Sequence, residues 1–225
     1  MLINLCNALM TGKRWKTPYV TDGLVAMWDG EWNAGPGAHD ANATSIVDLS
    51  GNEHALNLSG TFNIGSNYIY VDGASGAYGY INDFRFGSPT TQEMCIEVQS
   101  AGAWHRFIGE NRGLCCTSDG SIGYLYGFGY DASFTGVTQP GKNVKFTQSL
   151  TVANARAIFY CNGVISPYAN ASNTQYSGTT YVFNNANRNK GITGRLYNLR
   201  FYSRALTADE IAANYAIDKA RFGLP

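Results

Sequence analysis

Short apolar runs separated by turn residues fill most of the chain, and they predict β-strands. Residues 24–28 form one compact apolar run, which stops at Asp29-Gly30. Strands of this kind are short, rich in β-branched and aromatic residues, and bounded by turn residues. Further runs of the same kind cover residues 68–71, 94–98, 104–108 and 123–128. We therefore expect many short strands from residue 23 onward.

The strongest local signal for paired strands is the sequence around Asn162-Gly163. Apolar residues flank this pair on both sides. Asn-Gly between apolar runs favours a two-residue hairpin turn, in which both turn residues adopt positive φ. We expect a tight hairpin there.

Residues 194–202 alternate between two faces, as a strand does. Tyr197, Leu199 and Phe201 are expected to share one face, whereas Asn198 and Arg200 share the other. The pattern predicts that the first face lies in the core and that the second lies in water.

A helix is predicted directly after this strand. Residues 207–210, Thr-Ala-Asp-Glu, match a capping box, and Leu206 and Ile211 are spaced as the hydrophobic staple around it. Tyr215 and Phe222 follow at helical spacing. Gly223 then ends the element.

The first 20 residues stand apart from this pattern. Leu2, Leu5 and Leu9 have helical spacing, and basic residues follow them. Two interpretations are open: a short helix folded back on its own sandwich, or an arm that docks on another subunit. We expect an attachment or oligomerisation arm over residues 1–20 and one sandwich domain over residues 21–225. The basic residues follow the apolar part and no cleavage site is recognisable, so we expect no signal peptide and synthesis in the cytoplasm.

Composition narrows the possible partners. Sixteen basic residues balance sixteen acidic ones, which gives no general attraction to nucleic acid or to an anionic membrane. No run approaches the roughly 18 apolar residues of a membrane span. The five cysteines are odd in number and lack the spacing of a zinc or redox motif, so we expect them to be reduced.

Four stretches of the chain together resemble the laminin G-like, concanavalin A-like lectin/glucanase superfamily, particularly its bacterial and phage modules. They cover residues 23–28, 48–52, 160–164 and 194–207, the last followed by Glu210-Ile211. Residues 202–207, Tyr-Ser-Arg-Ala-Leu-Thr before a capped helix, are the most specific part. The resemblance implies an all-β fold, a two-sheet antiparallel jelly-roll sandwich with one C-terminal helix.

Glucanases on this fold carry their two catalytic carboxylates in a motif of Glu, apolar residue, Asp and a second Glu. The nearest match is Glu97-Val98-Gln99-Ser100, where Gln replaces the aspartate and no second Glu follows. Glycoside hydrolysis needs both carboxylates, so this departure argues against an enzyme. We interpret Glu93 and Glu97 as ordinary surface carboxylates.

Two kinds of binding site are predicted. Aromatic side chains with polar neighbours suit carbohydrate, and the candidate ligand-binding residues are Trp32, Asn33, Trp104, His105, Arg106, Tyr124 and Tyr126. Trp32 stands out because it lies in a loop rich in Gly and Pro. Asp48 and Asn52 supply oxygen atoms on a tight turn that suits a structural Ca²⁺; the alternative is a plain Asx turn.

These observations favour a non-catalytic recognition or structural module that binds carbohydrate or a cell-surface glycan. We expect it on a phage virion, as a capsid decoration or a tail or fibre part, attached to other subunits through the arm, or on a bacterial surface. The alternatives are a glycan-active hydrolase with an atypical carboxylate pair and an adhesin exported by an unrecognised route.

Overall fold

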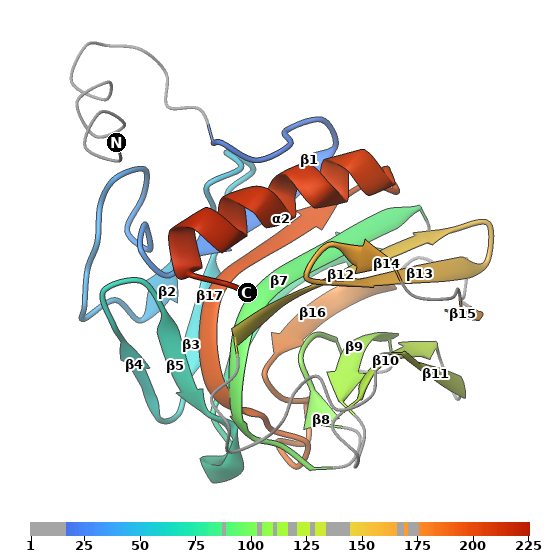
Figure 1. Ribbon diagram of the computed structural model, residues 1–225. Coiled ribbons are helices and arrows are strands. Elements are labelled where there is room, and N and C mark those ends of the chain that lie inside the picture. Colours follow the sequence, from blue (N-terminus) through green and yellow to red (C-terminus); the bar gives the residue numbers. More distant parts are fainter. Residues whose placement is uncertain are drawn as a thin grey trace.

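The computed structural model describes residues 17–86, 89–102, 105–109, 112–116, 121–126, 129–133, 145–165, 169–170 and 176–225. The described residues form two layers of antiparallel strands with helix α2 (Ala208–Phe222) laid across the outer face of one layer (Figure 1). The all-β sandwich with a C-terminal helix is therefore confirmed. No helix of this described part is long and apolar enough to cross a membrane.

The first layer is one nine-stranded sheet whose main path runs β14-β13-β12-β7-β17-β5-β4, with β1 paired to β17 and β15 paired to β13. Its strands are β1 (Leu24–Asp29), β4 (Phe62–Ile64), β5 (Ile69–Asp72), β7 (Thr90–Ser100), β12 (Lys145–Ala153), β13 (Arg156–Cys161), β14 (Val164–Ile165), β15 (Ala169–Asn170) and β17 (Thr193–Tyr202). A short 3₁₀ turn, η2 (Gly73–Ser75), follows β5.

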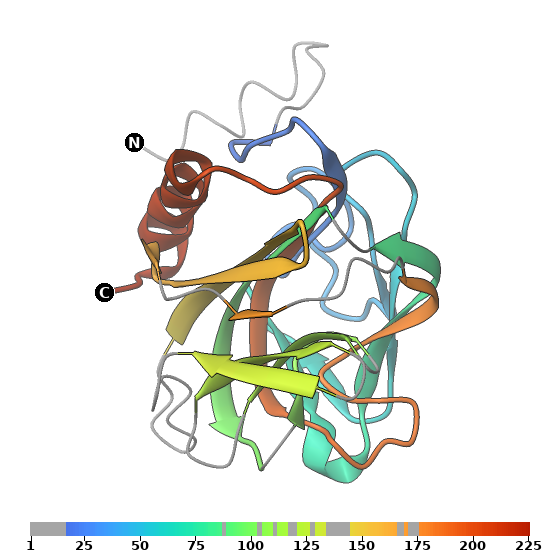
Figure 2. The same cartoon turned by 90° about the vertical axis from the view of Figure 1, so that its right-hand side faces the viewer.

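The second layer consists of two four-stranded sheets. One has the order β16-β6-β3-β2 and the other the order β11-β10-β9-β8. The strands of the first are β2 (Ser45–Ile46), β3 (Leu56–Ser59), β6 (Tyr78–Phe86) and β16 (Tyr176–Val182). The strands of the second are β8 (His105–Arg106), β9 (Arg112–Cys116), β10 (Ile122–Tyr126) and β11 (Gly129–Ser133). A bridge between Ile108 and Val182 joins the two sheets. Figure 2 shows the C-terminal helix at one side of the molecule, outside the sheets.

Apolar side chains fill the space between the two layers. Trp28 and Phe201 come from the nine-stranded sheet and Phe84 from the opposite layer, and all three are buried. The rings of Phe84 and Phe201 meet edge to face at 4.9 Å, a favourable geometry for aromatic pairs. This cluster continues along both layers and forms the main core.

The hairpin and the helix start match the sequence predictions. Asn162 and Gly163 both have positive φ, 50° and 74°, between β13 and β14. Thr207 accepts a hydrogen bond from the Glu210 amide, and the Glu210 carboxylate accepts one from the Thr207 amide. Leu206 and Ile211 are buried in one cluster, as the staple requires.

One residue of β17 departs from the predicted alternation. The pairing of β17 with β7 shifts between Leu196 and Asn198, which leaves Tyr197 as the extra residue of a β-bulge. Tyr197 consequently lies on the helix side with Asn198, where its ring packs against Phe222 at 5.3 Å. The prediction that Tyr197 shares a face with Leu199 is wrong, because a bulge resets the period of two.

The second face of β17 is also not in water. Asn198 and Arg200 are fully buried, because α2 covers this face. Arg200 pairs with Glu93 at 3.1 Å and with Asp218 of the helix at 2.8 Å, and its guanidinium lies 4.0 Å from the centre of the Tyr19 ring. We call Glu93, Arg200, Asp218, Asn214 and Tyr19 the ionic layer. The predicted wet face is thus an ion-paired interface.

Residues at the start of the described chain take part in this interface. The Tyr19 hydroxyl donates to Asp218 at 2.7 Å, and the Val20 amide donates to the side chain of Asn214 at 3.0 Å. Both residues fall at the end of the predicted arm. Residues 1–16, which hold Leu2, Leu5 and Leu9, lie outside the described residues, so the docking role of the arm stays a prediction.

Candidate functional site

Four polar or aromatic residues line up across the outer side of the β16-β6-β3-β2 sheet. Strand pairing sets Ser45 opposite Asn57, Asn57 opposite Tyr80, and Tyr80 opposite Tyr181. Paired residues of neighbouring strands share a face, so these four side chains form one row. Tyr80 and Tyr181 are half-buried, whereas the residues that alternate with them, Ile81 and Val182 among others, are buried in the core.

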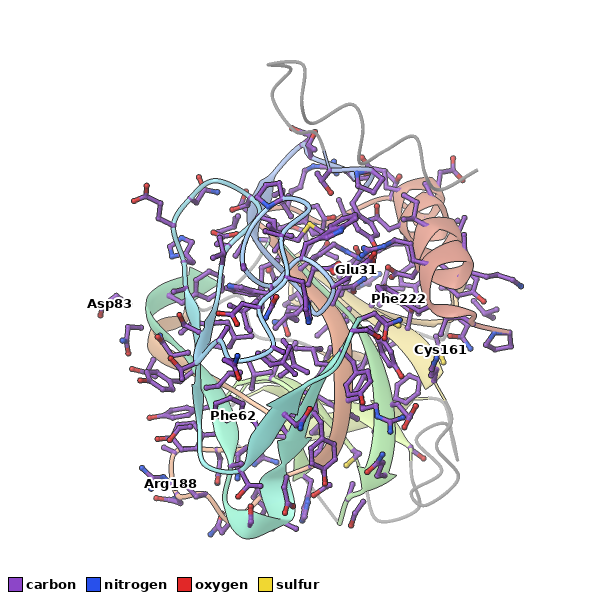
Figure 3. All side chains as sticks on the ribbon, turned by 90° about the vertical axis from the view of Figure 1, so that its left-hand side faces the viewer. Glu31, Phe62, Asp83, Cys161, Arg188 and Phe222 are labelled. Atoms are coloured by element: carbon purple, nitrogen blue, oxygen red, sulfur yellow. The ribbon has the colours of Figure 1, made fainter. Side chains whose placement is uncertain are left out.

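A second row brings another tyrosine and an arginine to the same face. Tyr78 pairs with Ser59 and is half-buried. Its ring lies 5.7 Å from that of Tyr80 and 5.8 Å from that of Tyr181. The exposed Arg188 lies over the Tyr78 ring at 4.9 Å and donates to its hydroxyl at 3.0 Å. Figure 3 shows Arg188 on the side of the molecule away from the helix.

We call Tyr78, Tyr80, Tyr181, Arg188 and Asn57 the tyrosine face. Its sequence basis is the alternation Tyr-Gly-Tyr-Ile at the start of β6, which sends the rings outward. A Cβ at the inward residue Gly79 would lie 2.9 Å from Leu56 Cδ1, so a larger residue there would make the buried Leu56 side chain shift. The glycine lets the sheet lie close to its own core while the tyrosines gather outside.

Trp32 and Asn33, the predicted ligand residues of the first loop, are already engaged within the protein. The guanidinium of Arg221, on the C-terminal helix, lies 4.0 Å from the centre of the half-buried Trp32 ring. Asn33 is fully buried and exchanges two hydrogen bonds with the backbone of Asp40, at 2.6 and 2.9 Å. These contacts favour roles in closing and anchoring the loop.

Four of the other predicted ligand residues belong to the β11-β10-β9-β8 sheet. His105 and Arg106 are half-buried on β8, and the His105 ring contacts the carbonyl of Gly191. Burial lowers the pKa of His105. Tyr124 and Tyr126 lie on β10, where only the backbone is described, and Trp104 lies outside the described residues. The predicted residues therefore come from separate regions and do not include the tyrosine face.

The turn at Asp48 is held by hydrogen bonds. Oδ1 accepts from the amides of Met27 and Ser50 at 2.9 Å each, and Oδ2 accepts from the Ser50 hydroxyl and the His54 amide. Asn52 donates to the Val25 carbonyl at 2.8 Å. Both carboxylate oxygens thus have two partners each, which favours the Asx-turn interpretation; the calcium site at Asp48 and Asn52 stays a prediction.

Glu93 and Glu97 are not surface carboxylates, so that interpretation is corrected. Both lie on the helix side of β7 and are buried. Glu93 accepts hydrogen bonds from Ser149, Arg200 and Asn214. Glu97 pairs with the half-exposed Arg195 at 3.0 Å and accepts a bond from the Tyr197 hydroxyl. No local pattern signals this burial, because the partners come from β12, from β17 and from the helix.

Comparison with known proteins finds similar folds but identifies no family. No model of a known protein family matches the chain, and no curated protein matches its sequence. Among solved structures, a Trypanosoma rangeli sialidase is similar at 14% identity and a TM-score of 0.65, over 88% of this chain and 33% of its own. The binding domain of Paraclostridial Mosquitocidal Protein 1 is similar at 16% identity and a TM-score of 0.65, over 87% and 52%.

A third similar structure is the binding domain of botulinum neurotoxin serotype D, at 14% identity and a TM-score of 0.66, over 90% of this chain and 53% of its own. The chain therefore spans between a third and about half of the length of these neighbours. At such low identity the likeness concerns the fold alone. It places the chain among β-sandwich folds; two of the three neighbours are binding domains, one of a mosquitocidal protein and one of a botulinum neurotoxin.

Proposed function

We propose that this chain is a non-catalytic recognition module that binds carbohydrate at the tyrosine face. The observation that carries the proposal is the cluster of three half-buried tyrosine rings with an exposed arginine beside them. Exposed aromatic clusters on a sheet often mark interaction sites, and a tyrosine offers an apolar ring together with a polar hydroxyl. This combination matches a sugar, whose C–H groups stack on rings while its hydroxyls form hydrogen bonds.

Polar groups around the rings supply the second half of sugar recognition. The Asn57 amide and the Ser59 and Ser45 hydroxyls belong to the same rows as the rings. Each can donate or accept a hydrogen bond. Arg188 adds a positive charge at the edge, next to Tyr78. Such a platform binds an extended glycan along the sheet without closing around it.

The buried carboxylates support a binding role over a hydrolytic one. Glu93 has a side chain only 1% exposed, and that of Glu97 is 3% exposed. Both are tied to arginines, so a glycan does not reach them in this conformation. The structural likeness to toxin binding domains fits the same proposal. The phage or bacterial-surface setting stays the sequence-based prediction stated above.

Binding to an array of bacterial and animal glycans, followed by calorimetric titration of the best ligand, tests the proposal. Tyr80→Ala and Tyr181→Ala should each weaken binding by about fivefold, because a lost stacking contact is worth about 1 kcal/mol. Tyr70→Ala is the matched control, since Tyr70 is a half-buried tyrosine on β5, in the other layer. Binding that is unaffected by both face variants contradicts the proposal, and release of sugar product would establish the hydrolase alternative.

A further inference from the structure

The positive charge of the tyrosine face is concentrated at one end. Arg188 is exposed there and lies over the Tyr78 ring at 4.9 Å. Asp83 is also exposed, but it lies five residues further along β6 than Tyr78, and Figure 3 shows it apart from Arg188. The residues of the two rows between them are all neutral: Ser45, Asn57, Tyr80 and Tyr181 in one row, Ser59 and Tyr78 in the other.

The Arg188 guanidinium keeps most of its capacity to form hydrogen bonds. A guanidinium has five N–H donors, and the structure engages one nitrogen, Nη2, which donates to the Tyr78 hydroxyl at 3.0 Å. None of the ion pairs among the described residues includes Arg188. The bond to Tyr78 therefore holds the charged group beside the rings, while its other N–H groups can donate to an acceptor outside the protein.

Hydrogen bonds fix the turn that carries Arg188. The Asn185 side chain donates to Asn189 Oδ1 at 3.0 Å and accepts a bond from the Asn189 amide at 3.1 Å. The fully buried Asn184 donates to the carbonyl of Ala77 at 3.2 Å. Ala77 directly precedes β6, so the turn is tied to the strand that carries the first two tyrosines.

The backbone of Arg188 adopts an uncommon conformation. Its φ is 58°, in the left-handed region, and its amide donates to the Asn185 carbonyl at 3.0 Å. Glycine or asparagine suits this region better than a long side chain does. Residues held in such conformations cluster at active sites and ligand-binding positions. An arginine in this turn therefore indicates that its side chain has a role there.

We propose that the tyrosine face selects glycans whose sugar units carry a negative group, a carboxylate or a sulfate, and that Arg188 binds this group. The inference rests on the function proposed above and deepens it. The sugar rings stack on Tyr80 and Tyr181, and the negative group lies at the Tyr78 end, opposite the Arg188 guanidinium. The planar guanidinium fork matches two oxygen atoms of such a group, which an ammonium group does not.

Pairs of glycans that differ only in charge test the inference on the intact chain. The strongest ligands of the glycan array should carry a carboxylate or a sulfate. Reducing that carboxylate to an alcohol, or removing that sulfate, should weaken binding about threefold to fivefold, because an exposed ion pair contributes up to about 1 kcal/mol. These two treatments also show which of the two groups the face takes. Added salt should weaken binding of the anionic form only.

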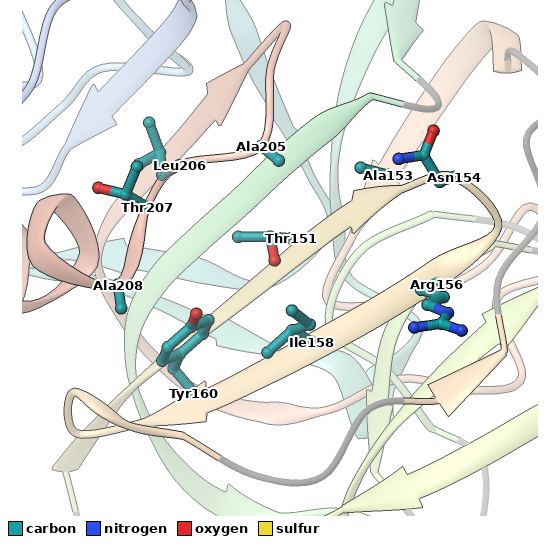
Figure 4. A pocket seen from close by; sticks show the side chains of 10 residues that line it. All are labelled: Thr151, Ala153, Asn154, Arg156, Ile158, Tyr160, Ala205, Leu206, Thr207 and Ala208. Atoms are coloured by element: carbon teal, nitrogen blue, oxygen red, sulfur yellow. The ribbon is translucent and has the colours of Figure 1, made fainter.

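Arginine variants locate the charged contact. Arg188→Gln should bring the ratio of the two affinities close to one, whereas Arg188→Lys keeps the charge without the fork and should retain part of the preference. Arg156→Gln is the matched control, because Arg156 is an exposed arginine on β13, in the opposite layer. Figure 4 shows Arg156 at one end of a pocket of about 640 Å³ beside the start of α2. The control should change neither affinity.

The possible outcomes separate this inference from the proposed function. Equal affinity for the anionic and the neutral form, with both weakened by Tyr80→Ala, overturns the selectivity for charge and leaves the glycan-binding face in place. Binding that no tyrosine variant affects, or no glycan binding at all, overturns both. A preference that Arg156→Gln removes and Arg188→Gln retains places the charged contact in the other layer and overturns the role of Arg188.

Discussion

The two faces of β17 contact different kinds of interior. One face presents Leu199 and Phe201 to a core that is almost entirely apolar. The other presents Asn198 and Arg200 to the ionic layer beneath α2. Both interiors exclude water equally well, since all four residues have side chains that are at most 1% exposed.

The two interiors differ in how strictly they fix the positions of the elements around them. Apolar contacts are non-directional and stabilise any close-packed arrangement of about the right volume. Hydrogen-bonded ion pairs act in one geometry only: Arg200 meets Glu93 on β7 and Asp218 on the helix at the same time. We infer that the apolar core supplies most of the stability, whereas the ionic layer fixes where the helix lies. Five changes test this comparison.

The largest effect is expected from Arg200→Met. The change leaves two carboxylates, Glu93 and Asp218, buried without their common cation, and breaking a buried pair in this way costs about 3–5 kcal/mol. Urea unfolding followed by circular dichroism measures the loss. Arg195→Gln is the control, because that arginine also pairs with a buried glutamate but is one-third exposed, and it should cost less.

A triple variant separates the effect of the charges in the ionic layer from the effect of burying side chains of that size. Glu93→Leu and Asp218→Leu added to Arg200→Met replace the three charges of the ionic layer by apolar groups of similar size. Such replacements are often neutral or stabilising, but Asn198, Asn214 and Tyr19 lose their buried acceptors, so stability should recover only part of the loss caused by Arg200→Met. If the single Arg200→Met variant is already as stable as the unmodified chain, the ionic layer has no role in holding the helix.

Ile211→Ala should have the next largest effect. Ile211 is 1% exposed and packs with Tyr160, Tyr202 and Leu206, where the helix touches apolar residues. Truncating a buried isoleucine costs about 2–5 kcal/mol. The denaturant midpoint should fall without a change in slope. A midpoint equal to that of the unmodified chain would show that the helix end is not docked on the sheet.

Thr207→Ala removes the N-cap only. The threonine hydroxyl accepts the Glu210 amide at 3.3 Å, and loss of such a cap costs about 1 kcal/mol. Thermal unfolding of Thr207→Ala and Thr207→Ser should differ, because serine keeps the cap. A loss as large as that of Ile211→Ala would mean that capping, and not packing, dominates this boundary.

The smallest effect concerns pH. Burial raises the pKa of Glu93 above its ordinary value of 4.5; Arg200 opposes the rise and Asp218 adds to it. The native state then holds more protons than the unfolded chain above that pH, so this contribution to stability falls as pH rises through the raised pKa. Glu93→Gln should therefore flatten the decline of the unfolding free energy above about pH 4.5. Identical profiles for the two proteins would contradict the raised pKa.

Local patterns in the sequence predicted the short strands, the Asn162-Gly163 hairpin and the capped helix, because each depends on residues a few positions apart. The sandwich itself was expected only from the family resemblance. The alternating pattern of β17 gave the wrong face for Tyr197, because only the pairing with β7 reveals the bulge there. The side of the helix that faces the sheet was harder to predict. Its buried stripe includes Asn214 and Asp218, polar residues that look like a solvent-facing side until their partners on the sheet are known.

The candidate sites were missed for a similar reason. Tyr78 and Tyr80 are visible as an alternation, yet only the pairing with β16 brings Tyr181, about a hundred positions later, beside them. Trp32 was expected to be exposed because of its loop, but Arg221 from the end of the chain covers its ring.

The buried cysteines provide a way to measure how often parts of the folded chain open. Cys95, Cys115, Cys116 and Cys161 are free and buried, and burial raises the pKa of Cys115 and Cys116 to about 12 and that of Cys161 to about 11. A thiol reagent needs a thiolate that it can reach. The folded chain therefore protects these four thiols in two ways: it buries them, and it raises their pKa so that little thiolate forms. Cys95 lies in the cluster under the end of α2, next to Phe222, whereas Cys161 belongs to the core between the layers. The rate at which each sulfur is alkylated therefore reports, separately, how often the helix lifts and how often the sandwich itself comes apart.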